Sequence, residues 1–279
     1  ATGWNRIPAD ERPTRPFEDE FQLTWLGHSG FLLRWHGTVL VLDPNTSPLC
    51  TITRRVMHVP ADLSAAGPVD AVLISHAHYD HMDAPTLARL SSISATILPA
   101  GSEDYFTAGQ KAHVRPRPIR VGETVRVGGL EVTAVPAAHN GNRFHPLGGP
   151  RFAVGYIIRS PTRTLYFAGD TGVQLDFDAL RERFHPDVAI LPIGAFAPRF
   201  PLRYFHISPE DAVAAARKLG VRMVVPCHFG TFTLALDRPS SALPRFASAA
   251  HAAGLPWAMP HWAGSDADLA APPATIGPP

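Results

Sequence analysis

The chain has 279 residues, of which 45% are hydrophobic and 18% are charged, and its formal net charge is +1. The apolar fraction and the low net charge exclude a disordered chain, and two cysteines exclude a framework of disulfide bonds. The near-neutral net charge does not indicate binding of nucleic acid. No apolar run approaches the roughly 20 residues of a membrane span. The 14 histidines stand out, because histidine is the commonest metal ligand in proteins.

We expect one catalytic domain, residues 21–263, between two ends that lack apolar periodicity. Residues 1–20 mix prolines with charges and are expected to form an N-terminal extension, and residues 264–279 are expected to form a flexible tail. No interior linker divides the domain. The chain begins at Ala1 without a visible signal peptide, so the sequence leaves the cellular compartment, and whether a leader preceded Ala1, undetermined.

Short apolar runs bounded by turn residues predict a series of strands. In chain order they are residues 21–25, 31–35, 38–42, 71–75, 95–98, 124–127, 130–135, 154–158, 164–167, 188–191 and 222–226. Helices are expected at residues 84–90, 177–184, 209–219 and 240–253. The early hairpins followed by alternating strands and helices predict a layered α/β or α+β fold, with sheets in the middle and helices outside.

The clearest helix signal follows Ser208. Ser208 is a typical N-cap, Pro209 occupies the first helical position, and Asp211 lies three residues after the cap. Gly220 is expected to end this helix.

The strand expected at residues 71–75 runs into a cluster of three histidines and one aspartate, His76, His78, Asp80 and His81. Residues two apart on an extended segment face the same side, so His76 and His78 can reach one ion together. The chain must then turn into the next helix, which lets Asp80 and His81 point to a second ion. A solvated polar loop is the alternative, but uncompensated polar groups at a buried strand end are costly.

Later strands also end at residues that can bind metal. His139 follows one apolar strand, Asp170 lies in a Gly-Asp-Thr-Gly turn after another, and His228 follows a third. Each signal is weak alone, but sheets of this kind hold their sites beyond the strand ends, so the recurrence predicts one shared site.

Together these residues resemble the metallo-β-lactamase fold, whose pattern is H-x-H-x-D-H, a downstream histidine, an aspartate in a G-D-T-G turn and a final histidine. The resemblance covers about residues 21–261 and implies a single α+β domain, an αββα sandwich with a two-metal site at one edge of its sheets. It implies that His76, His78 and His139 hold one ion. It further implies that Asp80, His81 and His228 hold the other, and that Asp170 bridges the two.

Several segments are similar to the N-acylphosphatidylethanolamine-hydrolysing phospholipase D group and its bacterial relatives. These segments are residues 25–29, 75–83, 167–172, 191–199, 204–213 and 227–232. The resemblance implies a phosphodiesterase. The related sugar-lactone hydrolases share the first motif and the Gly-His opening, so hydrolysis of a lactone or another carboxylic ester is the alternative. Residues 140–150 lack the aromatic-rich sequence of the animal lipid enzymes, which leaves the substrate open between a lipid-like and a smaller molecule.

Two ions roughly 3.5–4 Å apart would share a water and lower its pKa toward neutrality. Histidine and carboxylate ligands suit zinc first, with iron and manganese as alternatives. We therefore expect hydrolysis by a metal-bridging hydroxide, with Asp170 orienting it and accepting its proton. A non-catalytic metal-binding module is a remote alternative, because none of the expected ligand positions is lost.

Other residues are candidates for supporting roles. The resemblance places His206 facing the substrate, where it would bond a substrate oxygen or protonate a leaving group, unless it only holds the helix entrance. His28, in a Gly-His-Ser-Gly turn, either takes part in the site as a catalytic residue or packs in the turn. Asp43 ends a strand and could orient a ligand histidine. Cys227 is expected to be buried and to point away from the metals, and its pairing with Cys50 is left open.

Aromatic residues and arginines alternate within residues 196–205. This segment either contacts an acyl chain and its phosphate or covers the core with solvated arginines. The expected partner is a small or lipid-like molecule, with peripheral membrane contact allowed and no nucleic acid. The oligomeric state is left open.

Overall fold

The computed structural model of the chain describes residues 6–11, 21–57, 59, 63–143 and 152–259. The tail expected at residues 264–279 and most of the expected N-terminal extension lie outside the described residues. Within that extension, residues 6–11 pack against the domain: Ile7 is buried in the core, and Glu11 O accepts a hydrogen bond from Trp257 Nε1 at 3.2 Å.

The first sheet has six strands in the order β1-β2-β3-β6-β7-β8. Its first three strands pair antiparallel as consecutive hairpins, and the other three add in parallel. The strands are β1 (Phe21–Gly27), β2 (Gly30–Trp35), β3 (Thr38–Leu42), β6 (Ala71–Leu73), β7 (Thr96–Pro99) and β8 (Pro116–Ile119). A separate small hairpin joins β4 (Leu49–Cys50) to β5 (Thr53–Arg54).

The second sheet also has six strands, in the order β14-β13-β12-β11-β10-β9. Strands β9 to β12 pair antiparallel, whereas β12, β13 and β14 run parallel. The strands are β9 (Thr124–Val127), β10 (Leu130–Asn140), β11 (Phe152–Arg159), β12 (Thr164–Phe167), β13 (Val188–Pro192) and β14 (Met223–Cys227).

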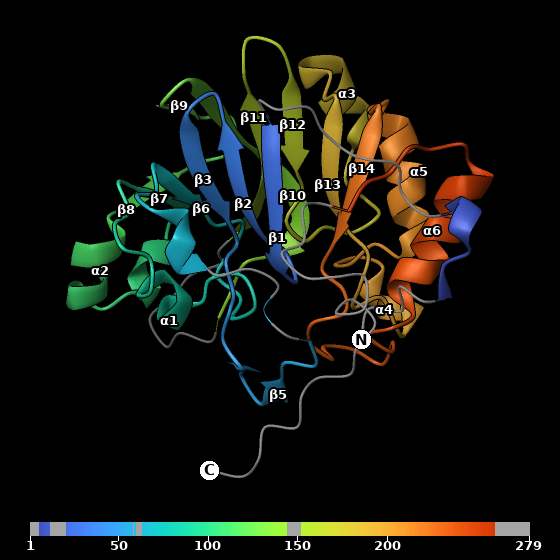
Figure 1. The fold of residues 1–279 in the computed structure, drawn as a ribbon, viewed down its shortest axis with the longest axis horizontal. Coiled ribbons are helices and arrows are strands. Elements are labelled where there is room, and N and C mark those ends of the chain that lie inside the picture. The colour runs from blue at the N-terminus through green and yellow to red at the C-terminus, as the bar shows by residue number, and fades with distance from the viewer. Residues whose placement is uncertain (1–5, 12–20, 58, 60–62, 144–151, 260–279) are drawn as a thin grey trace.

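Helices cover the outer faces of the two sheets (Figure 1). Those on the side of the first sheet are α1 (Ala84–Leu87) and α2 (Ala108–Val114). Those on the side of the second sheet are α3 (Phe177–Phe184), α5 (Pro209–Leu219) and α6 (Ala242–Ala252), with the short α4 (Arg199–Leu202) before α5. Single 3₁₀ turns lie at Ala9–Glu11, Leu63–Ala66 and Ser102–Tyr105. No helix in the described part of the chain is long and apolar enough to cross a membrane.

Two apolar clusters hold these layers together. The larger one joins the facing sides of the sheets and reaches α3, α5 and α6, with Trp25, Tyr156, Tyr166 and Phe246 among its largest buried side chains. The smaller one lies between the first sheet and its helices, around Val72, Ile74 and other residues. The order helices, sheet, sheet, helices confirms the expected αββα sandwich.

The differences from the expected elements have local causes. Strand β10 extends to Asn140 because Pro136 lies where the pairing with β11 becomes irregular, so its missing N–H costs the sheet little. Helix α1 ends earlier than expected, at Leu87. Helix α2 was not expected, although Thr107 and Gln110 form a capping box at its start. Strand β8 was missed because it contains two prolines, which only an edge strand tolerates.

Candidate metal centre

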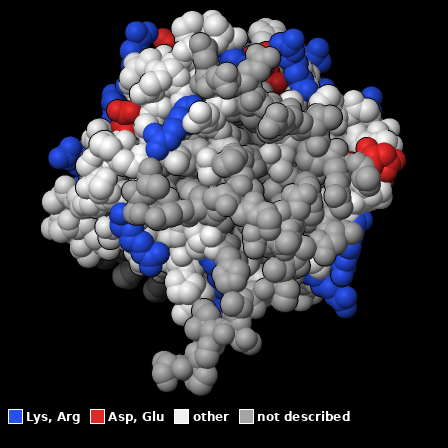
Figure 2. All heavy atoms as spheres, viewed as in Figure 1, with Lys and Arg blue, Asp and Glu red and all other residues white. Residues whose placement is uncertain are grey.

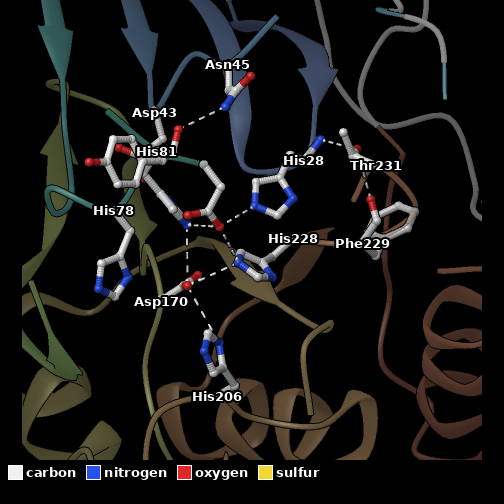
Figure 3. Close-up of polar contacts among 12 residues, drawn as sticks. His28, Asp43, Asn45, His78, His81, Asp170, His206, His228, Phe229 and Thr231 are labelled. Carbon is white, nitrogen blue, oxygen red and sulfur yellow. Dashed lines mark hydrogen bonds and ion pairs between the residues drawn. The ribbon is translucent and has the colours of Figure 1, made fainter. Parts of the chain in front are cut away.

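The candidate ligands converge at one edge of the sandwich, where β3, β6, β10, β12 and β14 end. Figure 3 shows four of them, His78, His81, Asp170 and His228, together with His28 and His206. The segment after β6, residues 75–83, carries four of them and is called the ligand loop below. The structure brings together all seven residues for which the sequence predicts metal binding. Their ligand atoms fall into overlapping groups in which every atom lies within 4.8 Å of the others.

The first half-site is formed by three histidines. His78 Nδ1 lies 3.0 Å from His76 Nε2 and 3.2 Å from His139 Nε2. Asp170 Oδ2 lies 4.0 Å from His76 Nε2 and 3.9 Å from His139 Nε2. These four atoms therefore lie close together.

The second half-site is tighter, and its four residues are all buried. His228 Nε2 lies 3.3 Å from Asp80 Oδ2 and 3.1 Å from Asp170 Oδ2. His81 Nε2 lies 3.3 Å from each of the same two oxygens. Asp170 Oδ2 thus belongs to both half-sites, and Figure 3 shows this carboxylate between His228 and His206.

Gly169 allows this placement of Asp170. It has a φ of 59°, in the left-handed region that favours glycine, and a Cβ there would lie 2.5 Å from Ser75 Cβ. The turn after β12 can therefore approach the ligand loop closely enough for its carboxylate to reach both half-sites.

The donor geometry fits bound metal ions. With metal–ligand bonds of 2.0–2.1 Å, neighbouring ligand atoms of a tetrahedral site lie about 3.3 Å apart. The four donors of the second half-site, whose measured separations are 3.1–3.3 Å, agree with this spacing. The buried atoms His81 Nε2, His228 Nε2 and Asp170 Oδ1 have no hydrogen-bond partner among the described residues. Buried polar atoms rarely stay unpaired, which supports a ligand here.

In four of the histidines, the ring nitrogen that faces away from the site (the outer nitrogen) forms a hydrogen bond. His76 Nδ1 donates to Ser75 Oγ at 2.9 Å, and His78 Nε2 donates to Asn140 Oδ1 at 3.1 Å. His139 Nδ1 donates to Phe205 O at 2.9 Å, and His81 Nδ1 donates to Asp43 Oδ2 at 2.7 Å. With these tautomers, the inner nitrogens present bare lone pairs to the site, as a metal requires.

Asp43 connects both half-sites from behind. Besides His81, its Oδ2 accepts a bond from Ser75 Oγ at 2.5 Å, and its Oδ1 accepts one from Ser75 N at 2.7 Å. Ser75 Oγ in turn accepts from His76, so one fully buried carboxylate orients a histidine of each half-site. The predicted orienting contact of Asp43 is therefore present, and it extends further than expected.

The charges of the second half-site are coupled. Burial lowers the pKa of a histidine, but the carboxylates of Asp170 and Asp80 outweigh it and raise the pKa of His228 to about 9. Burial works against ionisation of the two carboxyls, yet His228 and His81 hold their pKa values well below the usual range. Without a metal, protons on His81 and His228 supply this positive charge, and a divalent ion would displace them and leave the inner nitrogens bare.

His206 and His28 lie at opposite sides of the centre. His206 Nδ1 is 3.6 Å from Asp170 Oδ2, and burial lowers the pKa of His206 to about 4. His28 Nε2 donates to Asp80 Oδ2 at 2.9 Å, and burial lowers its pKa to about 3. Both rings therefore lie beside a carboxylate of the site.

Other side chains brace the ligand loop, and sequence reasoning did not single them out. Asn45 Nδ2 donates to Tyr79 O at 3.1 Å, and Ser47 Oγ donates to Asp83 Oδ2 at 2.6 Å. The sequence places Asn140 only in the segment 140–150, which differs from the animal lipid enzymes, and predicts no contact with a ligand for it. A motif cannot reveal such contacts, because they join segments far apart in the chain. The rest of the segment 140–150, residues 144–150, lies outside the described residues.

The two cysteines are buried, free thiols, so they form no disulfide with each other. Cys227 belongs to none of the candidate ligand groups found among the described residues.

In the segment 196–205, Phe196 is buried and Phe200 is exposed, and the Arg199 guanidinium pairs with Asp211 at the start of α5. The segment thus covers the core and also presents an aromatic side chain to solvent. On the face shown in Figure 2, the described lysines and arginines are scattered rather than gathered into one patch.

The fold and the arrangement of donors define a metal-dependent hydrolase with the metallo-β-lactamase fold. Residues 38–229 match the family described as the β-lactamase superfamily domain. A UPF0173 metal-dependent hydrolase of Pyrobaculum neutrophilum is 32% identical over 221 residues, which cover 78% of this chain and 88% of the relative. The chain belongs to the UPF0173 family of metal-dependent hydrolases within this superfamily.

Solved structures share the fold at lower sequence identity. Igni18, a metallo hydrolase of Ignicoccus hospitalis, matches with a TM-score of 0.64 and 24% identity, over 88% of this chain and 96% of that one. An isothiocyanate hydrolase from Delia radicum gut bacteria matches with a TM-score of 0.66 and 20% identity, over 86% and 95%. At these identities the match shows the architecture alone.

Proposed function

We propose that this chain is a dinuclear zinc-dependent phosphodiesterase, as its resemblance to the phospholipase D group implies. The observation that carries the proposal is the position of Asp170 Oδ2, which faces the donors of both half-sites at once. His76, His78 and His139 would hold one ion, and Asp80, His81 and His228 the other. When bound, two such ions polarise a substrate oxygen and lower the pKa of a water toward neutrality.

The residues of the chain would orient the reacting groups. Asp170 Oδ1 is buried and has no hydrogen-bond partner among the described residues. It would therefore be available to hold the attacking water and accept its proton, while Oδ2 would help to hold the ions. His206 Nδ1 is likewise buried and unpaired within the described part of the chain, and it lies beside the same carboxylate. From there His206 would donate a hydrogen bond to a substrate oxygen.

A neutral cyclic or linear ester is the second candidate substrate. It is favoured because arginines near the site already form contacts within the protein. Arg55 donates to Asn45 O and Ser47 O, and Arg199 pairs with Asp211. The Arg199 guanidinium, which lies beside His206 O, is therefore engaged by a carboxylate and is less available to a phosphate. Nε and Nη2 of Arg55 are engaged as well, and its Nη1 is buried. Within the described residues, a phosphodiester would then be held mainly by the metals and His206.

The test is an assay of the purified protein, with its metal content measured, on a phosphodiester panel and a lactone panel. The phosphodiester panel includes lipid-like and small diesters. The proposal expects metal-dependent release of a phosphomonoester, and loss of this activity in Asp170→Asn. Hydrolysis of lactones alone would establish the second candidate, and no hydrolysis by a protein with two bound metals would contradict both.

A further inference from the structure

The ligand loop depends on outside donors for some of its buried backbone groups. His81 N and Met82 N both bond to His78 O, which closes a tight turn inside the loop. The carbonyl groups of Ala77 and Met82 find no such partner within the loop, although both residues are buried. A buried carbonyl without a hydrogen-bond donor is destabilising, so donors from another segment are required.

Arg143 supplies both donors. Its Nε donates to Ala77 O and its Nη2 donates to Met82 O. Its guanidinium carbon lies 3.8 Å from the centre of the Tyr79 ring and 5.6 Å from the centre of the Tyr105 ring. The Tyr105 hydroxyl also donates to Arg143 O at 2.8 Å and accepts from Arg143 N at 2.9 Å, which fixes the backbone from which the side chain extends.

The chemistry of these contacts suits arginine alone. The described residues give Arg143 no carboxylate partner, so its cation is held by two carbonyl groups and two aromatic rings. A guanidinium is planar, and its donors keep a fixed spacing, whereas a lysine ammonium is a point charge on a flexible stem. The two bonds therefore fix the distance between Ala77 and Met82.

The segment between those two carbonyl groups carries ligands of both half-sites. His78 belongs to the first half-site, and Asp80 and His81 belong to the second. The same exit of β10 that leads to Arg143 also provides His139 and the Asn140 oxygen that bonds His78. The segment from His139 to Arg143 thus binds the carbonyl groups of Ala77 and Met82, and it also supplies a ligand that faces the ligand loop.

We propose that Arg143 is a positioning residue of the metal centre, which holds the ligands of the two half-sites in register by binding the carbonyl groups of Ala77 and Met82. The proposal rests on the dinuclear centre of the proposed function. It predicts that Arg143 controls metal affinity without touching metal or substrate. Supporting contacts of this kind typically change metal affinity about 10–100-fold.

The test compares Arg143→Met and Arg143→Lys with Arg126→Met. Arg126 is an exposed arginine of β9 that forms an ion pair with Glu131 at the start of β10. Each full-length variant is titrated with zinc against a chelator of known affinity, and its absorption spectrum is recorded with cobalt in place of zinc. Arg143→Met should bind both metal equivalents about 10–100-fold more weakly and alter the cobalt spectrum. Lysine should restore little, and Arg126→Met should match the wild type.

Thermal unfolding of the metal-free proteins separates positioning from general stability. If Arg143→Met lowers the Tm of the metal-free protein while both metals bind with wild-type affinity and spectrum, the proposal is overturned. Should this variant not fold, Tyr105→Phe removes the hydroxyl that fixes the Arg143 backbone, and unchanged metal affinity there would overturn the proposal equally. A wild-type protein that binds two metals but hydrolyses nothing contradicts the proposed function alone, whereas one that binds no metal contradicts both.

Discussion

Asp170 is placed where one carboxylate group can perform two tasks. Its Oδ2 faces ring nitrogens of both half-sites, and its Oδ1 is buried without a described partner. Asp170→Asn keeps the size of the side chain but removes its charge and its ability to accept a proton. At metal saturation we expect turnover to fall about 10²–10⁴-fold, the usual contribution of a general base.

The control for that variant is Asp178→Asn on α3, whose carboxylate forms only a solvent-exposed ion pair with Lys218 at 3.8 Å. Turnover is measured with the metal content of each sample. A near-normal rate in Asp170→Asn with both metals bound would remove Asp170 from the proposed proton transfer.

Asp43 acts on the centre through other side chains. Its carboxylate accepts from His81 Nδ1 and from Ser75, and Ser75 accepts from His76. Asp43→Ala leaves His81 Nδ1 without its acceptor, so the ring loses its fixed orientation. Metal affinity should fall about 10–100-fold, more at the half-site that contains His81.

The two metal equivalents are resolved by chelator titration. Asp70→Ala is the matched control, because Asp70 also accepts a backbone bond, from Val39 N at 2.8 Å, but contacts no candidate ligand. Equal affinity of Asp43→Ala and wild type for both equivalents would show that the contact with His81 is structural only.

The buried thiols allow a further test. Cys50 is 4% exposed, and burial raises the pKa of its thiol to about 12. At pH 8 this thiol is protonated and shielded, and Cys227 is shielded as well, so neither should react with a disulfide reagent. Both thiols should react after unfolding, and rapid release of even one equivalent from the folded protein would contradict the buried placement.

At the scale of elements, the start of α5 determines where His206 lies. Ser208 and Asp211 form a capping box, in which Ser208 Oγ accepts from Asp211 N at 3.2 Å and donates to Asp211 Oδ2 at 2.7 Å. Ser208→Ala should reduce the free energy of unfolding by about 1 kcal/mol, and the Tm by about 2–4 °C. Ser241→Ala is a matched control, because Ser241 begins α6 without a side-chain cap bond. An unchanged Tm in Ser208→Ala would show that the cap contributes nothing measurable.

The fold and the ligands could be predicted where the signals are local. The three histidines and the aspartate that follow β6 are close together in the sequence, so their convergence could be predicted. Ser208 and Gly220 likewise mark the two ends of α5. The supporting contacts could not be predicted in this way. Asn140 reaches His78 only because the pairing of β10 with β11 becomes irregular after Pro136.

The backbone conformation of several site residues also could not be predicted from local sequence patterns. His28 and His228 have φ angles of 54° and 58°, and Asp43 has a φ of 36°. Residues other than glycine rarely adopt such angles, and they persist where the surrounding packing enforces them. Three of them meet at this centre, so tertiary structure overrides local preference at the site itself.

For the whole molecule, the centre joins both sheets, because its ligands follow β6 of the first and β10, β12 and β14 of the second. Metal bound only by the folded state should therefore stabilise the entire domain. At 100 times its dissociation constant, each ion adds about 2.7 kcal/mol. Two ions would raise the Tm by about 10–20 °C, since 1 kcal/mol shifts a domain of this size by about 2–4 °C.

The measurement is thermal unfolding before and after treatment with a chelator, followed by return of zinc. The double variant His76→Ala/His228→Ala, which loses one candidate ligand from each half-site, should have a Tm that neither chelator nor zinc changes. If complete removal of metal leaves the Tm of the wild type unchanged, the ions do not link the two sheets. In that case the histidines and carboxylates of the centre are held in place by their hydrogen bonds alone.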